Sequence, residues 1–223
     1  MRILAVSDHV SDYLSTPGGL RAVAPVDVVI SCGDLPYDYL EYLVTLLDAP
    51  LGYVHGNHDA PLLTESGKML TIPRGCIDLN ERVVPLCGLA GETVVVAGLE
   101  GSMFYGGGRY QVTEREMARR ARRLIRRSVF QRSVHGRDLD MLVTHSPPRG
   151  IHDGDDRAHT GFEAFIRVID RLRPKLHLHG HTHAGAGYDS RPAVRGSTAI
   201  LSVYGYKILE RTAKEGAWTA TST

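Results

Sequence analysis

Short apolar runs that each end in a polar turn constrain the fold of this 223-residue chain more than any other feature of its sequence. Residues 2–7 (RILAVS), 27–32 (DVVISC) and 140–144 (DMLVT) are nearly continuous stretches of this kind, rich in Val, Ile and Leu. Such runs are typical of strands that are buried on both faces of a sheet. Leu and Val then recur at helical spacing between residues 36 and 49, so strand and helix alternate and the pattern predicts an α/β layered domain.

The second half of the chain continues the alternation. Further strands are predicted at residues 82–87, 93–97 and 176–179, with a closing strand or hairpin over residues 198–210. Thr113 and Glu116 have the spacing of a capping box and introduce an Arg-rich helix, and Thr160 and Glu163 predict a second helix in the same way. We find no internal repeat and no linker, so we expect one domain over residues 1–223.

Composition narrows the classes of protein to which the chain can belong. Its 26 basic and 25 acidic residues leave a formal net charge of +1, which gives no general attraction to nucleic acid or membranes. No apolar stretch approaches the roughly 20 residues of a membrane helix, and the first apolar run is too short for a secretory signal. The three cysteines are odd in number and lack metal-binding spacing, so we expect a protein of the reducing cytoplasm.

Candidate metal ligands stand where the apolar runs end. They are Asp8, Asp34, Asn57, His145, His181 and His183. In α/β sheets, ligands bind beyond the carboxyl ends of the strands, so residues far apart in sequence are expected to converge there. Carboxylate, amide and imidazole ligands together suit Mn, Fe, Zn or Co better than calcium. Two such ions roughly 3.5–4 Å apart can hold a hydroxide and clamp a phosphoryl group.

These motifs resemble those of the calcineurin-like metallophosphoesterases. The matching pieces are Asp8, Gly33-Asp34, Gly56-Asn57-His58-Asp59, His145 and Gly180-His181-Thr182-His183. They occur in the order typical of the family and span most of the chain; GNHD and GHTH together, with GD upstream, are highly specific. The resemblance implies a four-layer α/β fold in which two mixed sheets pack face to face between layers of helices. It also implies a site for two divalent metal ions at the strand ends.

The resemblance also implies a role for each matching residue. Asp34 corresponds to the carboxylate that bridges both ions, with Asp8 and His183 on the first ion. The second ion is expected on Asn57, His145 and His181. His58 corresponds to the catalytic histidine that contacts the phosphate and protonates the leaving oxygen, which suits a group that titrates near neutral pH. Asp59 corresponds to the carboxylate that orients this histidine.

One position departs from the pattern of the family. The first motif is usually Asp-x-His, and its histidine binds the first ion, whereas Val10 occupies that position here. His9, Asp12 and water are the alternatives as replacement ligands. His9 requires a sharp turn after Asp8, because neighbouring side chains of an extended chain point to opposite faces. We therefore hypothesise that the second ion binds tightly and the first exchanges.

Several other groups have both a structural and a functional interpretation. His55, His135 and His177 are expected to be structural, and His179 either packed or in contact with a metal ligand. The acidic loop over residues 153–159 is either solvated or a wall of the substrate pocket. The glycine-rich residues 98–108 form either a rim of the active site or a plain connection. The Arg-rich helix is either a solvated face or a guide for anionic substrates.

The sequence therefore predicts a metal-dependent phosphoesterase, most specifically a phosphodiesterase, that attacks phosphorus with a metal-activated hydroxide. Its partner is then a phosphate-ester substrate; no membrane is expected, and nucleic acid enters only as a substrate. The alternatives are a phosphomonoesterase or a nuclease of the same fold, or a metal-binding regulator that has lost catalysis together with the histidine at position 10. The sequence does not indicate the oligomeric state.

Overall fold

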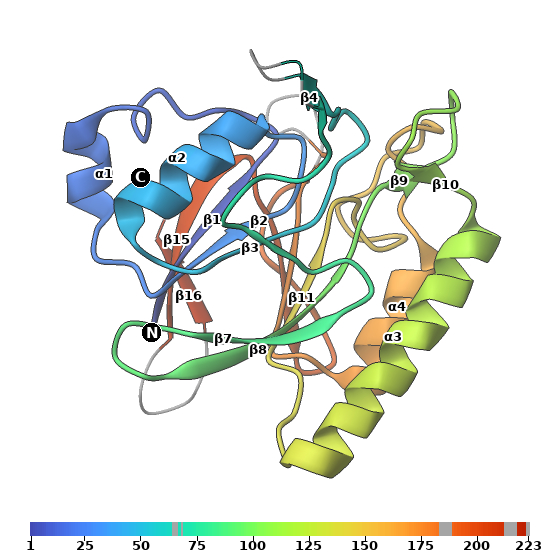
Figure 1. The fold of residues 1–223 in the computed structure, drawn as a ribbon. Coiled ribbons are helices and arrows are strands. Elements are labelled where there is room, and N and C mark those ends of the chain that lie inside the picture. Colours follow the sequence, from blue (N-terminus) through green and yellow to red (C-terminus); the bar gives the residue numbers. More distant parts are fainter. Residues whose placement is uncertain (64–66, 68, 183–188, 212–217, 222–223) are drawn as a thin grey trace.

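The computed structural model describes residues 1–63, 67, 69–182, 189–211 and 218–221. Within this part of the chain, two six-stranded sheets and four helices form the main body (Figure 1). Along the first sheet the strands are β16 (Trp218–Thr221), β15 (Gly205–Arg211), β1 (Arg2–Ser7), β2 (Val28–Ser31), β3 (Leu51–Tyr53) and β6 (Ile77–Asp78). The strands β1, β2, β3 and β6 are parallel, β15 pairs antiparallel with β1, and the edge strand β16 pairs antiparallel with β15.

The second sheet also has six strands. Its strands are, in order, β13 (Ala193–Arg195), β14 (Thr198–Ser202), β12 (Leu176–His179), β11 (Met141–Thr144), β8 (Thr93–Leu99) and β7 (Val83–Cys87). The four central strands are parallel, and β13 and β7 pair antiparallel at the two edges. Two further pairs of short strands are β9 (Ser102–Met103) with β10 (Gln111–Val112) and β4 (Leu62–Leu63) with β5 (Met69–Leu70).

Helices cover the outer face of each sheet, and α1 (Pro17–Val23) and α2 (Tyr37–Leu47) lie on the first. The second sheet is covered by α3 (Glu114–His135) and α4 (Glu163–Leu172), which pack against each other. Alternate residues of a strand point to opposite faces, so Ile3 and Ala5 enter the core between the sheets while Leu4 and Val6 pack under the helices. These layers confirm the predicted fold of two mixed sheets that are packed face to face and flanked by helices.

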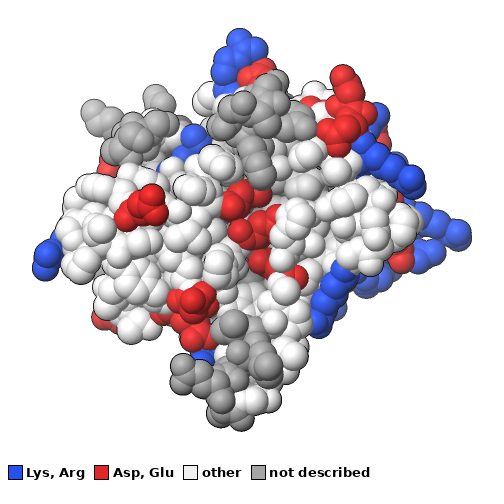
Figure 2. Space-filling model, turned by 90° about the horizontal axis from the view of Figure 1, so that it is seen from above, with Lys and Arg blue, Asp and Glu red and all other residues white. Residues whose placement is uncertain are grey.

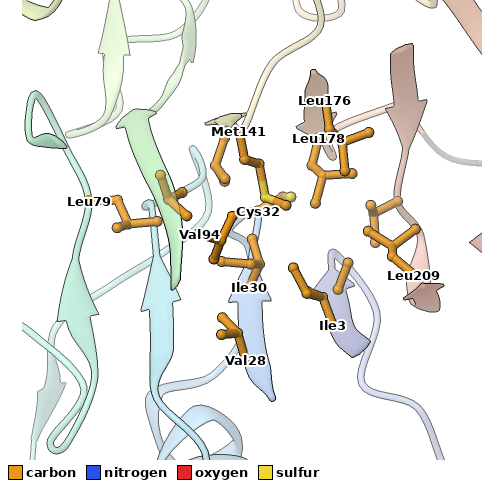
Figure 3. Packing of buried hydrophobic residues seen from close by; sticks show 14 of the residues in the cluster. Ile3, Val28, Ile30, Cys32, Leu79, Val94, Met141, Leu176, Leu178 and Leu209 are labelled. Atoms are coloured by element: carbon orange, nitrogen blue, oxygen red, sulfur yellow. The ribbon is translucent and has the colours of Figure 1, made fainter. Parts of the chain in front are cut away.

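The core between the sheets is made almost wholly of Val, Ile, Leu and Met side chains (Figure 3). Met141 and Leu178 from the second sheet face Ile30 and Ile3 from the first, and all four are fully buried. Burial of such side chains contributes roughly 1.5–3 kcal/mol each. This contact fixes the position of one sheet relative to the other, and with it the distance between loops that leave the two sheets.

The predicted strands and helices are confirmed, with two corrections. Thr160 does not cap α4: its hydroxyl donates to the carbonyl of Asp156 at 2.8 Å, and Phe162 is the N-cap. The reason is that Phe162 is held extended by backbone hydrogen bonds to Pro147 and Arg149. The closing segment is not a hairpin either, because β14 lies in the second sheet and β15 in the first.

The capping box of Thr113 and Glu116 is present, and α3 ends at His135, where Gly136 forms the C-cap in a left-handed conformation. Among the described residues, no helix is both long and apolar enough to cross a membrane.

Candidate metal centre

The candidate ligands follow the carboxyl ends of parallel strands in both sheets. Asp8 comes directly after β1, and Asp34 follows β2 by way of a short turn. Asn57 lies beyond β3, while His145 and His181 follow β11 and β12. Because the two sheets face each other, the loops from all five strands meet at one end of the sandwich.

The structure brings three of these side chains into one group. A ligand atom each from Asp34, His145 and His181 lies within 4.8 Å of the others. The Nε2 atom of His145 is 3.3 Å from Asp34 Oδ2 and 2.9 Å from the amide oxygen of Asn57. Asp8 joins the group through its carboxylate, which accepts the backbone N–H of His181 at 3.0 Å. Carboxylate, amide and imidazole atoms thus converge as a divalent transition metal requires.

Backbone partners fix how each histidine faces this group. His145 Nδ1 donates to the carbonyl of Cys32 at 2.8 Å, which leaves Nε2 toward Asp34. His181 Nε2 is 2.8 Å from the carbonyl of Ala158, and since a carbonyl only accepts, this nitrogen carries the proton. The lone pair of a neutral His181 is therefore on Nδ1. A partner on the far nitrogen is the usual way in which proteins set the tautomer of a metal-binding histidine.

Two motif glycines allow the loops to approach so closely. A Cβ atom on Gly56 would lie 2.0 Å from the Asp34 carboxylate, and one on Gly180 would lie 2.0 Å from the hydroxyl of Ser7. No real contact is this short, so a larger residue would displace the ligand-bearing loops. The glycines of the GNHD and GHTH motifs are thus required by packing around the carboxylates.

The backbone is strained at the ligands themselves. Asp8, Asp34 and His181 have φ values of 63°, 55° and 68°, in the left-handed region that side chains rarely adopt. Such conformations cost roughly 1–3 kcal/mol each and cluster at functional sites. The sharp turn at Asp8 also lets the backbone N–H of His9 donate to the carbonyl of Ser7 at 2.7 Å.

Electrostatics in this group favour a cation beside Asp34. Burial by itself raises the pKa of the Asp34 carboxyl, but the charge and hydrogen bond of His145 outweigh it and lower the pKa to about 2. Burial disfavours the charged form of His145, yet the charges of Asp34 and Asp8 raise its pKa to about 9. Burial lowers the pKa of His181 to about 3. A protonated His145 thus supplies, in the metal-free protein, positive charge that a bound ion would replace.

His58 and Asp59 lie next to this group. The backbone N–H of His58 donates to Asp34 Oδ1 at 2.8 Å, and the exposed His58 lines a groove. Asp59 Oδ2 accepts the backbone N–H groups of Gly56 at 2.8 Å and Asp34 at 3.3 Å. Burial raises the pKa of Asp59 to about 6. The carboxylate of Asp59 therefore ties the GD turn to the GNHD turn through their backbones.

The remaining predicted ligand, His183, lies outside the described residues. At the position of the usual family histidine, Val10 packs against the apolar cluster under α1 and α2. The exposed ring of His9 stacks on Tyr204 with centroids 5.6 Å apart, and Asp12 is exposed. Neither His9 nor Asp12 belongs to the metal-binding group that the described residues form.

Tyr105 was not recognised from the sequence as a site residue. Its hydroxyl oxygen accepts the amide N–H of Asn57 at 3.0 Å, which turns the amide oxygen of Asn57 toward His145. Gln111 holds the loop in place, because its side-chain oxygen accepts the backbone N–H groups of Tyr105, Gly106 and Gly107 at 2.8–3.2 Å. The glycine-rich loop thus reaches the site, as the rim interpretation predicted; the only sequence signal was a tyrosine among glycines.

The other histidines have partners of their own. His55 is buried between Glu100, 2.8 Å from Nδ1, and the hydroxyl of Tyr37, 3.1 Å from Nε2. The buried His177 and His179 contact Thr144 and His152, respectively, each at 2.8 Å. His135 is instead exposed in the last turn of α3. The acidic loop touches the site through Ala158 and through His159, whose ring centroid is 5.0 Å from that of His181.

The sequence model of the family described as calcineurin-like phosphoesterase matches residues 1–185 of this chain. Over 52 residues the chain is 36% identical to a UPF0046 protein of Caenorhabditis elegans, a stretch that covers 22% of this chain and 17% of that relative. The match therefore spans less than a fifth of the length of the relative.

Solved structures share the fold at low sequence identity. The crystal structure of TT1561 of Thermus thermophilus has a TM-score of 0.62 and 15% identity, covering 99% of this chain and 98% of that chain. GAP50, described as the anchor in the inner membrane complex of Plasmodium, has a TM-score of 0.55 and 11% identity, covering 99% of this chain and 83% of that one. At such identities the likeness concerns the fold alone.

Proposed function

This chain belongs to the calcineurin-like phosphoesterase family, and we propose that it is a metal-dependent phosphoric ester hydrolase that acts on phosphodiesters. The observation that carries the proposal is the convergence of Asp34, His145 and His181 within 4.8 Å at the carboxyl ends of the strands. Asn57 and Asp8 are hydrogen-bonded to the same group. This donor set fits divalent Mn, Fe, Zn or Co.

We assign the ligands as the motifs suggest. Asp34 would be shared by two ions; Asp8 and His183 would hold the first, and Asn57, His145 and His181 would hold the second. Bound ions of this kind lower the pKa of water and offset the charge on phosphoryl oxygens. Since Val10 cannot bind a metal, we propose that water would take the place of this ligand on the first ion, which would then exchange faster than the second.

The residues of the chain then have separate roles in hydrolysis. A water-derived oxygen forms a bond to phosphorus while the bond from phosphorus to the leaving oxygen breaks. His58 donates its imidazole proton to that leaving oxygen, which spares the departing group a full negative charge. Asp59 keeps the turns that carry Asp34 and His58 in register through the backbone of Gly56 and Asp34. Tyr105 holds the Asn57 amide so that its oxygen faces His145 and would be available to a metal ion.

Hydrolysis of chromogenic and natural esters by the Mn²⁺-loaded chain tests the proposal. We expect turnover of bis-p-nitrophenyl phosphate that exceeds turnover of p-nitrophenyl phosphate, a cyclic nucleotide and single-stranded DNA. Asp34→Asn should abolish it, whereas Asp48→Asn, at the exposed far end of α2, should not. Faster cleavage of the monoester or of DNA would assign one of the two rival activities. Bound metal without turnover of any ester would favour a non-catalytic regulator.

Location is a separate proposal. The three cysteines are free, with Cys32 buried, Cys76 partly buried and Cys87 exposed. Free thiols are usual in the reducing cytoplasm, and we propose that compartment for the protein.

A further inference from the structure

A groove of about 390 Å³ opens beside the candidate metal centre. Two segments line it, residues 34–38 and 58–61, and each continues directly from a site motif. Asp34 and the exposed His58 both line it. The volume lies within the usual range for small-molecule sites, roughly 300–1,000 Å³.

Most of the lining is apolar. The residues that contribute no charge are Leu35, Pro36, Tyr37, Ala60 and Pro61. The aromatic wall is rigid, because the Tyr37 hydroxyl donates to the carbonyl of Thr71 at 3.1 Å and is also 3.1 Å from His55 Nε2. Glu100 in turn fixes His55 at 2.8 Å. The groove therefore offers a fixed apolar surface rather than an adaptable polar one.

Besides the imidazole of His58, three carboxylates line the groove. They are Asp34, Asp38 and Asp59, and no Lys or Arg lines the groove within the described part of the chain. Figure 2 shows acidic side chains gathered in the centre of the face seen from above, while most Lys and Arg side chains lie toward its margin. An anionic leaving group in the groove would be repelled by Asp38, and none of the described residues that line the groove is a Lys or Arg that could offset this charge.

Asp38 is the carboxylate that faces solvent. It lies in the first turn of α2, and its Oδ1 atom accepts the backbone N–H of Tyr39 at 3.0 Å. The start of a helix attracts anions through its free N–H groups, and here a carboxylate of the chain already occupies one of them. The carboxylate of Asp38 thus brings a negative charge to the groove, and the N-terminal dipole of α2 offsets only part of it.

We propose that this groove receives the leaving alcohol of the substrate and selects an uncharged or cationic organic group over an anionic one. The inference rests on the proposed hydrolase function, because His58 can serve the leaving oxygen only if the alcohol departs on its side. Substrates of this class are phosphate esters of neutral or ammonium-bearing alcohols. Esters whose leaving group carries a carboxylate or a second phosphate are disfavoured.

Three methyl phosphodiesters of matched phenols test the selection. The leaving groups are phenol, 3-hydroxybenzoate and 3-(trimethylammonio)phenol, and the readout is the ratio of kcat/KM for the cationic ester to that for the anionic ester. Wild type is compared with Asp38→Asn, which keeps an oxygen to accept the Tyr39 N–H but removes the charge. Because the intrinsic reactivity of each ester is the same for both proteins, a change in the ratio measures how much the charge of Asp38 contributes to selection in the groove. Asp48→Asn, at the other end of α2, is the control.

We expect the ratio to fall about fivefold to tenfold in Asp38→Asn, since one charge acts on the two esters in opposite directions at a few ångströms in water. The control should keep the ratio of the wild type. An unchanged ratio in Asp38→Asn, with all three esters cleaved, would overturn the inference and leave the hydrolase function intact.

Binding of the free alcohols separates the inference from the activity. The metal-free chain is titrated with 3-(trimethylammonio)phenol and with 3-hydroxybenzoate, and the amide signals of Ala60 and Leu35 are followed by NMR. Shifts with the cation that exceed those with the anion support the groove even if no ester is cleaved, a result that would remove only the proposed function. Equal shifts with the two alcohols, or no shifts, would refute the proposed selection by the groove.

Discussion

Metal binding at Asp34, His145 and His181 should release about one proton at pH 7, because an imidazole must lose its proton before that nitrogen binds a metal. Proximity to Asp34 and Asp8 outweighs burial and raises the pKa of His145 to about 9, so the ring is protonated at pH 7. The other two ligands have no proton to lose. The pKa of Asp34 is about 2, and that of His181 about 3.

The size of the effect of pH on metal affinity follows from the difference between the pKa of His145 and the pH of the experiment. Removal at pH 7 of a proton whose pKa is about 9 costs about 3 kcal/mol. The apparent metal affinity should therefore be about 100-fold weaker at pH 7 than well above pH 9, and should rise about tenfold for each pH unit between 6 and 8. The apparent metal affinity increases with pH because the protonated fraction of His145 decreases.

Isothermal titration calorimetry with Mn²⁺ in buffers of different ionisation enthalpy measures the number of protons directly. We expect a slope of about one proton at pH 7 that declines as the pH passes through 9. Protons lost from water on the ion would instead increase with pH, so the two sources are separable. If metal binding depends on His145 but releases no protons at pH 7, the ion pair between His145 and Asp34 is refuted.

Three further results follow from the structure. Tyr105→Phe should weaken metal binding about fivefold, because it removes one hydrogen bond to Asn57 that is worth about 1 kcal/mol. Tyr13→Phe, at an exposed position, should leave the metal titration unchanged, and equal metal affinities of the two variants would contradict this role of Tyr105. Dialysis of the Mn²⁺-loaded chain should remove one ion faster than the other, since Val10 supplies no ligand, and loss of both at one rate would contradict a labile first ion. A thiol reagent should label the exposed Cys87 of the folded chain but not Cys32, because Cys32 is fully buried and its burial raises the pKa of the thiol. Mass spectrometry of the labelled peptides measures this, and labelling of Cys32 in the folded chain would contradict it.

Much of the fold was predictable because the chain has strong local patterns. Continuous apolar runs indicated the central strands, and capping at Thr113 and Glu116 placed the start of α3 correctly. The start of α4 was not predictable from spacing, because Phe162 is held extended by Pro147 and Arg149, which are distant in sequence. The assignment of β14 and β15 to different sheets likewise depends on long-range pairing.

The candidate site was predictable in part. Ligand types at strand ends indicated a metal centre, since the carboxyl ends of parallel strands converge. No local pattern showed that Tyr105 meets Asn57 or that the Ala158 carbonyl holds His181, because both contacts join loops that are far apart in sequence. The roles assigned to the site residues, and the expectation of a single domain, stay predictions.

Anomalous diffraction from crystals of the Mn²⁺-loaded chain tests the central claim most directly. We expect two ions roughly 3.5–4 Å apart, with the Asp34 carboxylate in contact with both. The second ion should be bound by Asn57, His145 and His181, with the 3.3 Å contact between His145 Nε2 and Asp34 Oδ2 replaced by bonds to the metal. Ions bound elsewhere, with His145 still paired to Asp34, would contradict the proposed metal centre.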